Sequence, residues 1–172
     1  MEIILCTEKN LKELTEFYNK VVIYLEKTIN YPYWVYGVYP CELTIKADID
    51  KKCQYACIKD GKIVGGIVLN EDPGGKIENA KISFKRGEFL VIHTLASDYK
   101  NFREGIASKM IKYCIEKAKK EGYKAIYADV VPTNTPSQNL FKKCGFLYLG
   151  DYDLERTFNK NIPLFSIYEY KL

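Results

Sequence analysis

The strongest constraint on the fold is a regular alternation of strand and helix patterns in the second half of the chain. Residues 87–97 are predicted to form a long buried strand, residues 105–121 repeat apolar side chains at helical spacing, and residues 123–131 return to a strand pattern. A short helix with Thr135 as its N-cap follows and ends at Gly145. Two further strands close the chain. This alternation predicts an α/β domain with a mixed sheet.

The first half of the chain supplies fewer regular patterns. A short apolar strand over residues 3–6 precedes a helix over residues 11–29, for which Asn10 and Glu13 are spaced as a capping box. Residues 30–42 hold two prolines and five aromatic side chains, so they are predicted to form an irregular connection.

Two β-rich runs then flank Asp60-Gly61, which is a strong hairpin signal. Gly65 and Gly66 lie inside the second run and predict a bulge or a close backbone neighbour. The predicted elements follow one another as βα, an irregular segment, βββ and αβαββ, and no composition change between them marks a domain boundary. We therefore expect one domain over residues 1–172.

Composition narrows the classes of function. The net charge of +4 is spread evenly, so it predicts neither a nucleic-acid partner nor a membrane surface. The apolar runs are too short to span a bilayer and the first ten residues lack signal-peptide features, so we expect a cytoplasmic protein. Six cysteines without a CxxC pair and a single histidine predict no metal site and reduced thiols.

One segment, residues 93–111, predicts a phosphate ligand. A buried strand passes through a polar turn into a helix whose first residues are small, namely Gly105, Ala107 and Ser108. Such a turn presents backbone N–H groups and the positive end of a helix dipole to an anion. The segment is neither a GxxxxGK[ST] loop nor a GxGxxG fingerprint, and an ordinary strand-to-helix turn would show the same residues.

A second segment, residues 128–146, favours the phosphate site over an ordinary turn. Together the two segments resemble the GNAT superfamily of N-acetyltransferases, in which a turn written Arg/Gln-x-x-Gly-x-Gly/Ala grips the pyrophosphate of coenzyme A. Gly105 and Ala107 match the last two fixed positions of that turn. The downstream pattern Asn-x-x-small-x-x-Leu-aromatic-x-x-x-Gly-Phe is matched by Asn134, Ser137, Leu140, Phe141, Gly145 and Phe146.

The resemblance implies a mixed, mostly antiparallel sheet flanked by helices, with acetyl-CoA as cofactor. It implies transfer of the acetyl group to a primary amine of a small molecule, peptide or protein by direct attack in a ternary complex. It is compatible with a monomer or a homodimer. The coenzyme A contacts that it implies are Leu95, Ala96, Ser97, Phe102, Arg103, Glu104, Gly105, Ile106, Ala107, Ser108, Asn134, Ser137 and Phe141.

Two positions depart from the family pattern. Phe102 stands where Arg or Gln is usual, so backbone N–H groups must carry most of the phosphate binding. Phe141 stands where many members have a tyrosine that protonates the departing thiolate. Tyr148, Tyr99 or water could supply that proton, or the thiol, with a pKa near 8.5, could leave as thiolate.

Amine acetylation also needs a base, an oxyanion stabiliser and an acceptor pocket. His93 is the candidate base, with Glu88 and Asp98 as the other candidates, although a lone histidine on a buried strand is often structural. Asp129 fits either a base or an ordinary polar strand end. The resemblance places free N–H groups near Leu95 and Ser97.

The acceptor is predicted to enter beside the aromatic segment and the loop around residues 72–86. Tyr33, Trp34 and Tyr36 could stack on an amine-bearing molecule or belong to the core. Two other functions stay open at this point. The first is a catalytically silent acyl-CoA sensor or scaffold, which the Phe102 and Phe141 departures would allow; the second, a nucleic-acid-binding domain, is disfavoured by the even charge.

Overall fold

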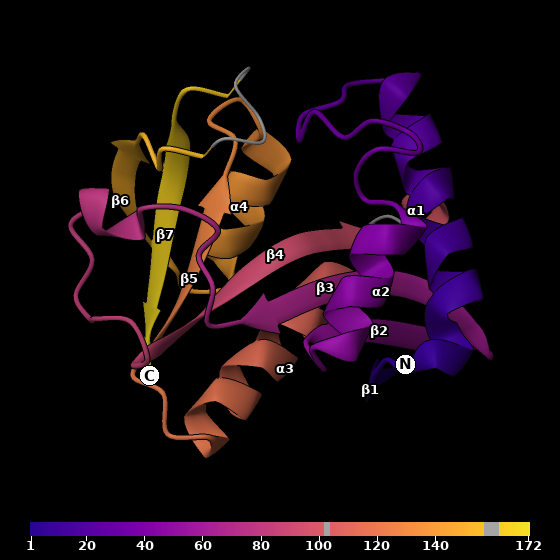
Figure 1. Ribbon diagram of the computed structural model, residues 1–172, viewed down its shortest axis with the longest axis horizontal. Helices are drawn as coiled ribbons and strands as arrows, with labels where there is room; N and C mark the ends of the chain where they lie inside the picture. Colours follow the sequence, from indigo (N-terminus) through magenta and orange to yellow (C-terminus); the bar gives the residue numbers. More distant parts are fainter. Residues whose placement is uncertain (102–103, 157–161) are drawn as a thin grey trace. The chain divides into compact units, whose positions relative to one another are not determined.

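A computed structural model of the protein describes residues 1–101, 104–156 and 162–172. The described chain separates into two compact units (Figure 1). Unit 1 comprises Met1–Leu69 and Thr94–Tyr113, and unit 2 comprises Asn70–His93 and Cys114–Leu172. Strand β4 and helix α3 each contribute residues to both units.

The chain has a mixed sheet, as predicted. The strands are β1 (Glu2–Leu5), β2 (Gln54–Lys59), β3 (Lys62–Asn70), β4 (Phe89–Ser97), β5 (Ala125–Val130), β6 (Leu147–Tyr152) and β7 (Phe165–Lys171). They are hydrogen-bonded in the order β1-β2-β3-β4-β5-β7-β6. The β4–β5 pair is parallel, whereas β1–β2, β2–β3, β5–β7 and β6–β7 are antiparallel. The mostly antiparallel arrangement that the resemblance implied is confirmed.

The described residues form four α-helices: α1 (Leu11–Glu26), α2 (Glu42–Asp50), α3 (Ile106–Lys120) and α4 (Thr135–Lys143). Helix α2 was missed, because its nine residues carry only two buried side chains and no clear apolar stripe. The expected capping box at Asn10 and Glu13 is wrong. The Thr7 N–H donates to Asn10 Oδ1 instead, at 2.9 Å, and the Glu13 carboxylate accepts from the Ile63 N–H at 2.9 Å.

In unit 1, the two glycines of β3 let helices approach both faces of the strand. A Cβ on Gly66 would lie 2.7 Å from Cζ of Tyr18 in α1, and a Cβ on Gly65 would lie 2.7 Å from Sδ of Met110 in α3. Consecutive strand residues face opposite sides, so α1 and α3 pack against opposite faces of β3. This confirms the predicted close neighbour. The pairing of β2 with β3 also shifts register between Cys57 and Ile58.

The Asp60-Gly61 hairpin is confirmed as well. Both residues have positive φ, +50° and +71°, as a two-residue turn between antiparallel strands requires. The core above the hairpin strands is formed by the buried side chains Cys6, Leu14, Phe17, Tyr18, Val21, Ile45, Ile49, Ala56, Ile63 and Ala96.

Unit 2 has a separate core built around β5 and β7. Phe89 packs edge-on against Tyr127, with ring centroids 4.8 Å apart. The Tyr127 hydroxyl donates to the buried carboxylate of Glu169 at 2.5 Å, and the Ser83 N–H and hydroxyl donate to the same carboxylate at 3.0 Å. Burial alone would raise the pKa of Glu169, but these donors outweigh it and lower the pKa. The loop that carries Ser83 is thereby fastened to the two strands.

None of the helices in the described ranges is both long enough and apolar enough to cross a membrane.

We expect the substitution Gly66→Ala to lower the free energy of unfolding by about 1–3 kcal/mol, because the added methyl group overlaps the Tyr18 ring. Urea unfolding followed by circular dichroism measures the change. Gly61→Asn is the control: its φ of +71° suits Asn and a Cβ there meets no atom within 4 Å, so its effect should stay below about 1 kcal/mol. Equal effects of the two substitutions would contradict the packing argument.

Candidate functional site

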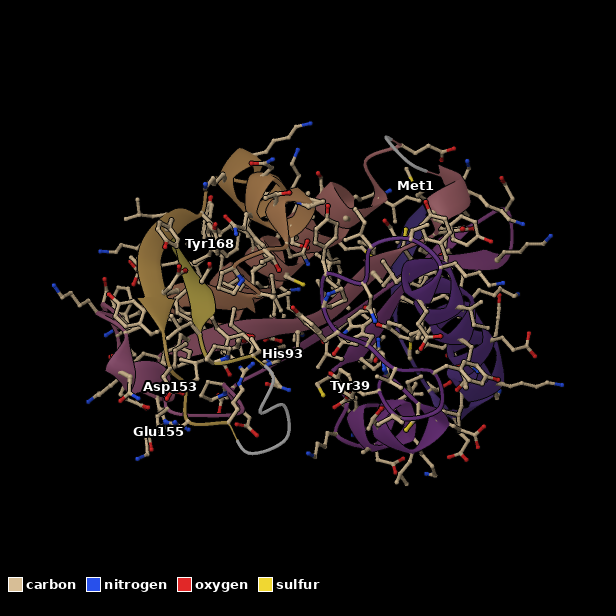
Figure 2. The ribbon with its side chains drawn as sticks, turned by 90° about the horizontal axis from the view of Figure 1, so that it is seen from above. Met1, Tyr39, His93, Asp153, Glu155 and Tyr168 are labelled. Atoms are coloured by element: carbon tan, nitrogen blue, oxygen red, sulfur yellow. The ribbon has the colours of Figure 1, made fainter. Side chains whose placement is uncertain are left out.

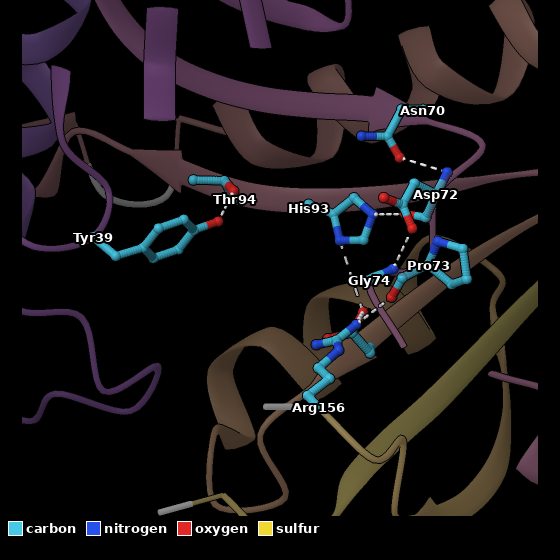
Figure 3. A network of polar contacts seen from close by, with 9 residues as sticks. Tyr39, Asn70, Asp72, Pro73, Gly74, His93, Thr94 and Arg156 are labelled. Atoms are coloured by element: carbon cyan, nitrogen blue, oxygen red, sulfur yellow. Dashed lines mark hydrogen bonds and ion pairs between the residues drawn. The ribbon is translucent and has the colours of Figure 1, made fainter. Parts of the chain in front are cut away.

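Strand β4 bends at Thr94, the residue at which unit 1 resumes. Thr94 has a φ of +48°, a left-handed conformation that is rare for a β-branched residue. The Tyr18 hydroxyl donates to the Thr94 carbonyl at 2.8 Å, and the hydroxyls of Tyr39 and Thr94 lie 2.6 Å apart (Figure 3). Burial raises the pKa of Tyr18, which keeps this donor protonated. Two tyrosines therefore hold the strand in a strained shape.

The residues that follow the bend are the predicted acyl-binding ones. The parallel register of β4 with β5 runs from Phe89, opposite Ala125, to Ile92, opposite Ala128. Leu95, Ala96 and Ser97 follow this register and the bend, and the Asp98 N–H donates to the Val64 carbonyl in β3 at 2.9 Å.

Helix α3 begins as the sequence predicts, directly after a glycine in a left-handed turn. Gly105 has a φ of +76°, and no heavy atom of the described residues lies within 4 Å of where a Cβ would stand. The Lys109 N–H donates to the Gly105 carbonyl at 2.9 Å, which is the first hydrogen bond of the helix. The N–H groups of Ile106, Ala107 and Ser108 therefore have no acceptor within the helix. This turn can present backbone donors to an anion.

The neighbours of that turn are only partly described. Phe102 and Arg103, which were predicted to contact coenzyme A, lie outside the described residues. The Glu104 carboxylate accepts from Lys59 Nζ at 2.7 Å, and both side chains are partly exposed. Glu104 is thus an ion-pair partner of the β2–β3 hairpin.

In unit 2, the predicted second motif forms helix α4 and its cap. The N-cap is Asn134 rather than Thr135: the Asn134 side chain accepts from the Ser137 N–H at 3.1 Å. Asn matches the capping geometry as well as Thr does, and sequence spacing alone did not separate them. Phe141 is buried, with its ring centroid 5.1 Å from that of Phe146 and 6.0 Å from that of Tyr168. Tyr168, on β7, is labelled in Figure 2.

His93 is held by polar contacts rather than by an apolar pocket. Its Nε2 lies 2.8 Å from the Asp72 carbonyl oxygen, and its Nδ1 lies 3.8 Å from Asp129 Oδ1 (Figure 3). A carbonyl only accepts hydrogen bonds, so Nε2 must carry the proton and Nδ1 carries the lone pair of the neutral ring. The His93 side chain is 19% exposed.

Arg156 is the site residue that the sequence analysis missed. Its two terminal nitrogens donate to the two Asp129 oxygens, each at 2.7 Å, and Nη2 also donates to the Pro73 carbonyl at 2.6 Å. The side chains are 7% and 11% exposed. Asp129 is therefore neither an isolated base nor a plain strand end. Composition was the one signal in the sequence that could have drawn attention to Arg156, because the chain has 23 lysines and only three arginines.

The two acidic candidates for the base are engaged elsewhere. The Glu88 carboxylate accepts from Lys124 Nζ at 2.6 Å and from the Lys85 N–H at 3.1 Å, and these donors, Lys124 above all, lower the pKa of Glu88. The Asp98 carboxylate accepts from the Lys100 N–H at 2.9 Å, which orders the turn after β4. Both carboxylates therefore accept hydrogen bonds from other parts of the chain.

The aromatic side chains of residues 33–36 differ in their exposure to solvent, and so in whether they can stack on a ligand or belong to the core. Tyr33 and Tyr36 are exposed, and the Tyr36 N–H donates to the Glu26 carboxylate at 2.9 Å. Trp34 is partly buried and packs edge-on against Tyr18 and Tyr39, with centroids 6.2 and 6.3 Å apart. Tyr33 and Tyr36 are thus available to a ligand, whereas Trp34 belongs to the packing of unit 1.

The two tyrosines named as alternative acids lie in different surroundings. Tyr99 stacks on Tyr24 with centroids 4.2 Å apart. Burial and a hydrogen bond to Asp151 raise the pKa of Tyr148, so its proton is held more firmly.

Comparisons with known proteins agree with these features. A model of the acetyltransferase (GNAT) family matches residues 23–146. Among solved structures, ribosomal-protein-alanine N-acetyltransferase from Brucella melitensis superposes with a TM-score of 0.71 at 16% identity, covering 100% of both chains. A GNAT-family acetyltransferase from Streptococcus agalactiae gives 0.73 at 17% identity, covering 99% of this chain and 95% of the other. The yncA protein from Salmonella typhimurium, solved with its cofactor acetyl-CoA, gives 0.71 at 14% identity, covering 100% and 94%.

We expect Tyr18→Phe to lower the free energy of unfolding by about 1–3 kcal/mol, because the Thr94 carbonyl loses its donor in a buried setting. Chemical unfolding of the purified variant measures it. The same change at the exposed Tyr36 is the matched control and should be neutral. A Tyr18→Phe variant as stable as wild type would mean that this hydrogen bond does not support the bend.

Proposed function

The chain belongs to the GNAT family of acetyltransferases, and from that premise we propose that it is an acetyl-CoA-dependent N-acetyltransferase acting on a primary amine. The observation that carries the proposal is the turn at Gly105, where a left-handed glycine leads directly into α3 and no described residue lies within 4 Å of its Cβ position. The small side chains of Ala107 and Ser108 keep that space accessible. An acceptor on a small molecule, a peptide or a protein is compatible with this chemistry.

The described residues offer groups that fit acetyl-CoA in each unit. In unit 1, the N–H groups of Gly105–Ser108 are suited to the pyrophosphate, and the backbone of Leu95–Ser97 is suited to the pantetheine arm. In unit 2, we assign Asn134, Ser137 and the Phe141 ring to the same ligand by motif. Bound acetyl-CoA would supply the acetyl group as an activated thioester.

We assign the proton transfer of the reaction to His93. Its Nδ1 lone pair accepts a proton from the acceptor ammonium, directly or through a water molecule, so that the neutral amine can attack the acyl carbonyl in a ternary complex. The N–H groups of Leu95 and Ser97 are the donors proposed for the carbonyl oxygen as negative charge develops on it.

The departing sulfur needs no side-chain acid in this scheme. Phe141 has no proton to give, but a thiol of pKa about 8.5 leaves readily as thiolate. No cysteine is required as a covalent carrier. Because Phe141 cannot donate a proton, a second function is an acyl-CoA-binding protein without turnover. An assay of free thiol distinguishes the two functions: release that depends on an added amine indicates the transferase.

Gly105→Glu is expected to abolish acetyl-CoA binding, because a carboxylate would fill and charge the space above the turn. At a hundredfold excess over Kd, acetyl-CoA should stabilise the wild-type chain by about 2.7 kcal/mol, and the variant should show no thermal shift. Gly122→Glu is the matched control. Gly122 also has a positive φ, +82°, with open space, but follows the other end of α3, so binding should persist. Loss of binding in both variants, or in neither, would defeat the assignment.

His93→Gln is expected to lower kcat by roughly 10²-fold or more while leaving the KM for acetyl-CoA near the wild-type value. The Gln side-chain amide can still donate to the Asp72 carbonyl, so the variant removes mainly the basic lone pair. Thiol release with a panel of primary amines measures both constants. The deficit should shrink as the pH rises and the acceptor deprotonates unaided. Turnover unchanged at every pH would return His93 to a structural role.

A further inference from the structure

We propose that Arg156 is a positioning residue that fixes the tautomer of His93, keeping the proton on Nε2 and the lone pair on Nδ1. The inference rests on the proposed role of His93 as base. It concerns residues of unit 2 alone and is testable without substrate.

Two acceptors compete for the imidazole proton. The Asp72 carbonyl oxygen lies 2.8 Å from Nε2, within hydrogen-bond distance, whereas Asp129 Oδ1 lies 3.8 Å from Nδ1, beyond it. A carboxylate is ordinarily the stronger acceptor of the two. An uncommitted Asp129 would draw the proton to Nδ1 and leave the lone pair on the nitrogen that faces a carbonyl oxygen, where it could not serve as a base.

Arg156 removes that competition by occupying both oxygens of Asp129. The two N–H···O contacts, each 2.7 Å, form a fork that matches the carboxylate and neutralises its charge. The pair is 7% and 11% exposed, so water does little to screen it. Asp129 is thereby kept at 3.8 Å from the imidazole instead of closing on it.

The same side chain also holds the competing acceptor in place. Arg156 Nη2 donates to the Pro73 carbonyl at 2.6 Å, in the turn next to Asp72 (Figure 3). That turn is ordered further by the Asp72 N–H on Asn70 Oδ1 at 3.0 Å and by the Gly74 N–H on Asp72 Oδ1 at 2.8 Å. One guanidinium thus restrains Asp129 and steadies the turn that presents the Asp72 carbonyl to Nε2.

Lysine could not replace arginine here. A single ammonium cannot span both oxygens of a carboxylate as a planar fork and reach a backbone carbonyl at once. The guanidinium also lies 4.5 Å from the centroid of the Phe165 ring, which restrains its plane. In a chain with 23 lysines, an arginine at this position marks a geometric requirement beyond positive charge.

Near the imidazole in unit 2, Asp129 comes from β5, Arg156 follows β6 and pairs with Asp129, and the Asp72 carboxylate belongs to the turn after β3. The Asp72 carboxylate accepts from its own turn, and Asp129 is paired with Arg156. The tautomer is consequently decided by one carbonyl and one restrained carboxylate.

The test is a nitrogen NMR measurement of the imidazole, made at a pH where the ring is neutral. His93 is the sole histidine, so uniform ¹⁵N labelling gives one unambiguous pair of ring nitrogens. The full chain is compared with Arg156→Met and with Arg156→Lys, which keeps the charge but loses the fork. Arg86→Met is the matched control. Arg86 also grips this loop, through the Gly75 carbonyl and the Glu78 carboxylate, but no contact joins it to Asp129 among the described residues.

We expect the Nε2-protonated form to dominate in the wild type and in Arg86→Met, and the Nδ1-protonated form to dominate in Arg156→Met. Arg156→Lys should give a mixture, and it supplies the measurement if Arg156→Met does not fold. The double substitution Arg156→Met with Asp129→Leu should restore the Nε2-protonated form, because the rival acceptor is gone.

A wild type with the proton on Nδ1, or an Arg156→Met variant that keeps it on Nε2, would overturn the inference. The kcat of Arg156→Met should fall roughly tenfold or more with the KM for acetyl-CoA unchanged. A tautomer change without any change in kcat would support the role of Arg156 and refute His93 as the base. These failures are therefore distinguishable.

Discussion

The left-handed bend at Thr94 is the constraint on which the predicted chemistry depends. A β-branched residue at a φ of +48° costs on the order of 1–3 kcal/mol, so it persists only where the surroundings impose it. Here the Tyr18 hydroxyl satisfies the Thr94 carbonyl and the Tyr39 hydroxyl bonds the Thr94 side chain. The bend follows the last β4–β5 partners and precedes Leu95–Ser97. The strand thus departs from extended geometry next to the residues whose backbone N–H groups we propose as donors to an acyl group.

The supports of the bend come from elements that the glycines of β3 allow to approach. Tyr18 reaches Thr94 because Gly66 leaves room for its ring, and Met110 of α3 packs where Gly65 lacks a side chain. The helix that follows the proposed phosphate-binding turn and the helix that carries Tyr18 therefore pack against the same strand. The small residues of β3 thus bear on the placement of the groups that we propose for binding and catalysis.

In unit 2, two carboxylates with little exposure to solvent each have their own donors. Glu169 is buried and accepts from Tyr127 and Ser83, which fastens a loop to the sheet. Asp129, with 11% of its side chain exposed, is paired with Arg156 and also lies 3.8 Å from the His93 ring. The Glu169 carboxylate thus stabilises the fold. In the proposed mechanism, the Asp129 carboxylate helps to position His93, the base.

Local patterns in the sequence determined the strand and helix order, the Asp60-Gly61 turn, the glycine pair in β3 and the open turn at Gly105, because each depends on residues close together in the chain. They also suggested His93 as a base. Helix α2 and the cap at Asn134 escaped, since their signals are weak or shared by neighbouring residues. Only the tertiary structure joined Arg156 to Asp129 and Pro73, residues 27 and 83 positions away. No periodicity encodes such a contact, because it forms when separate elements fold together.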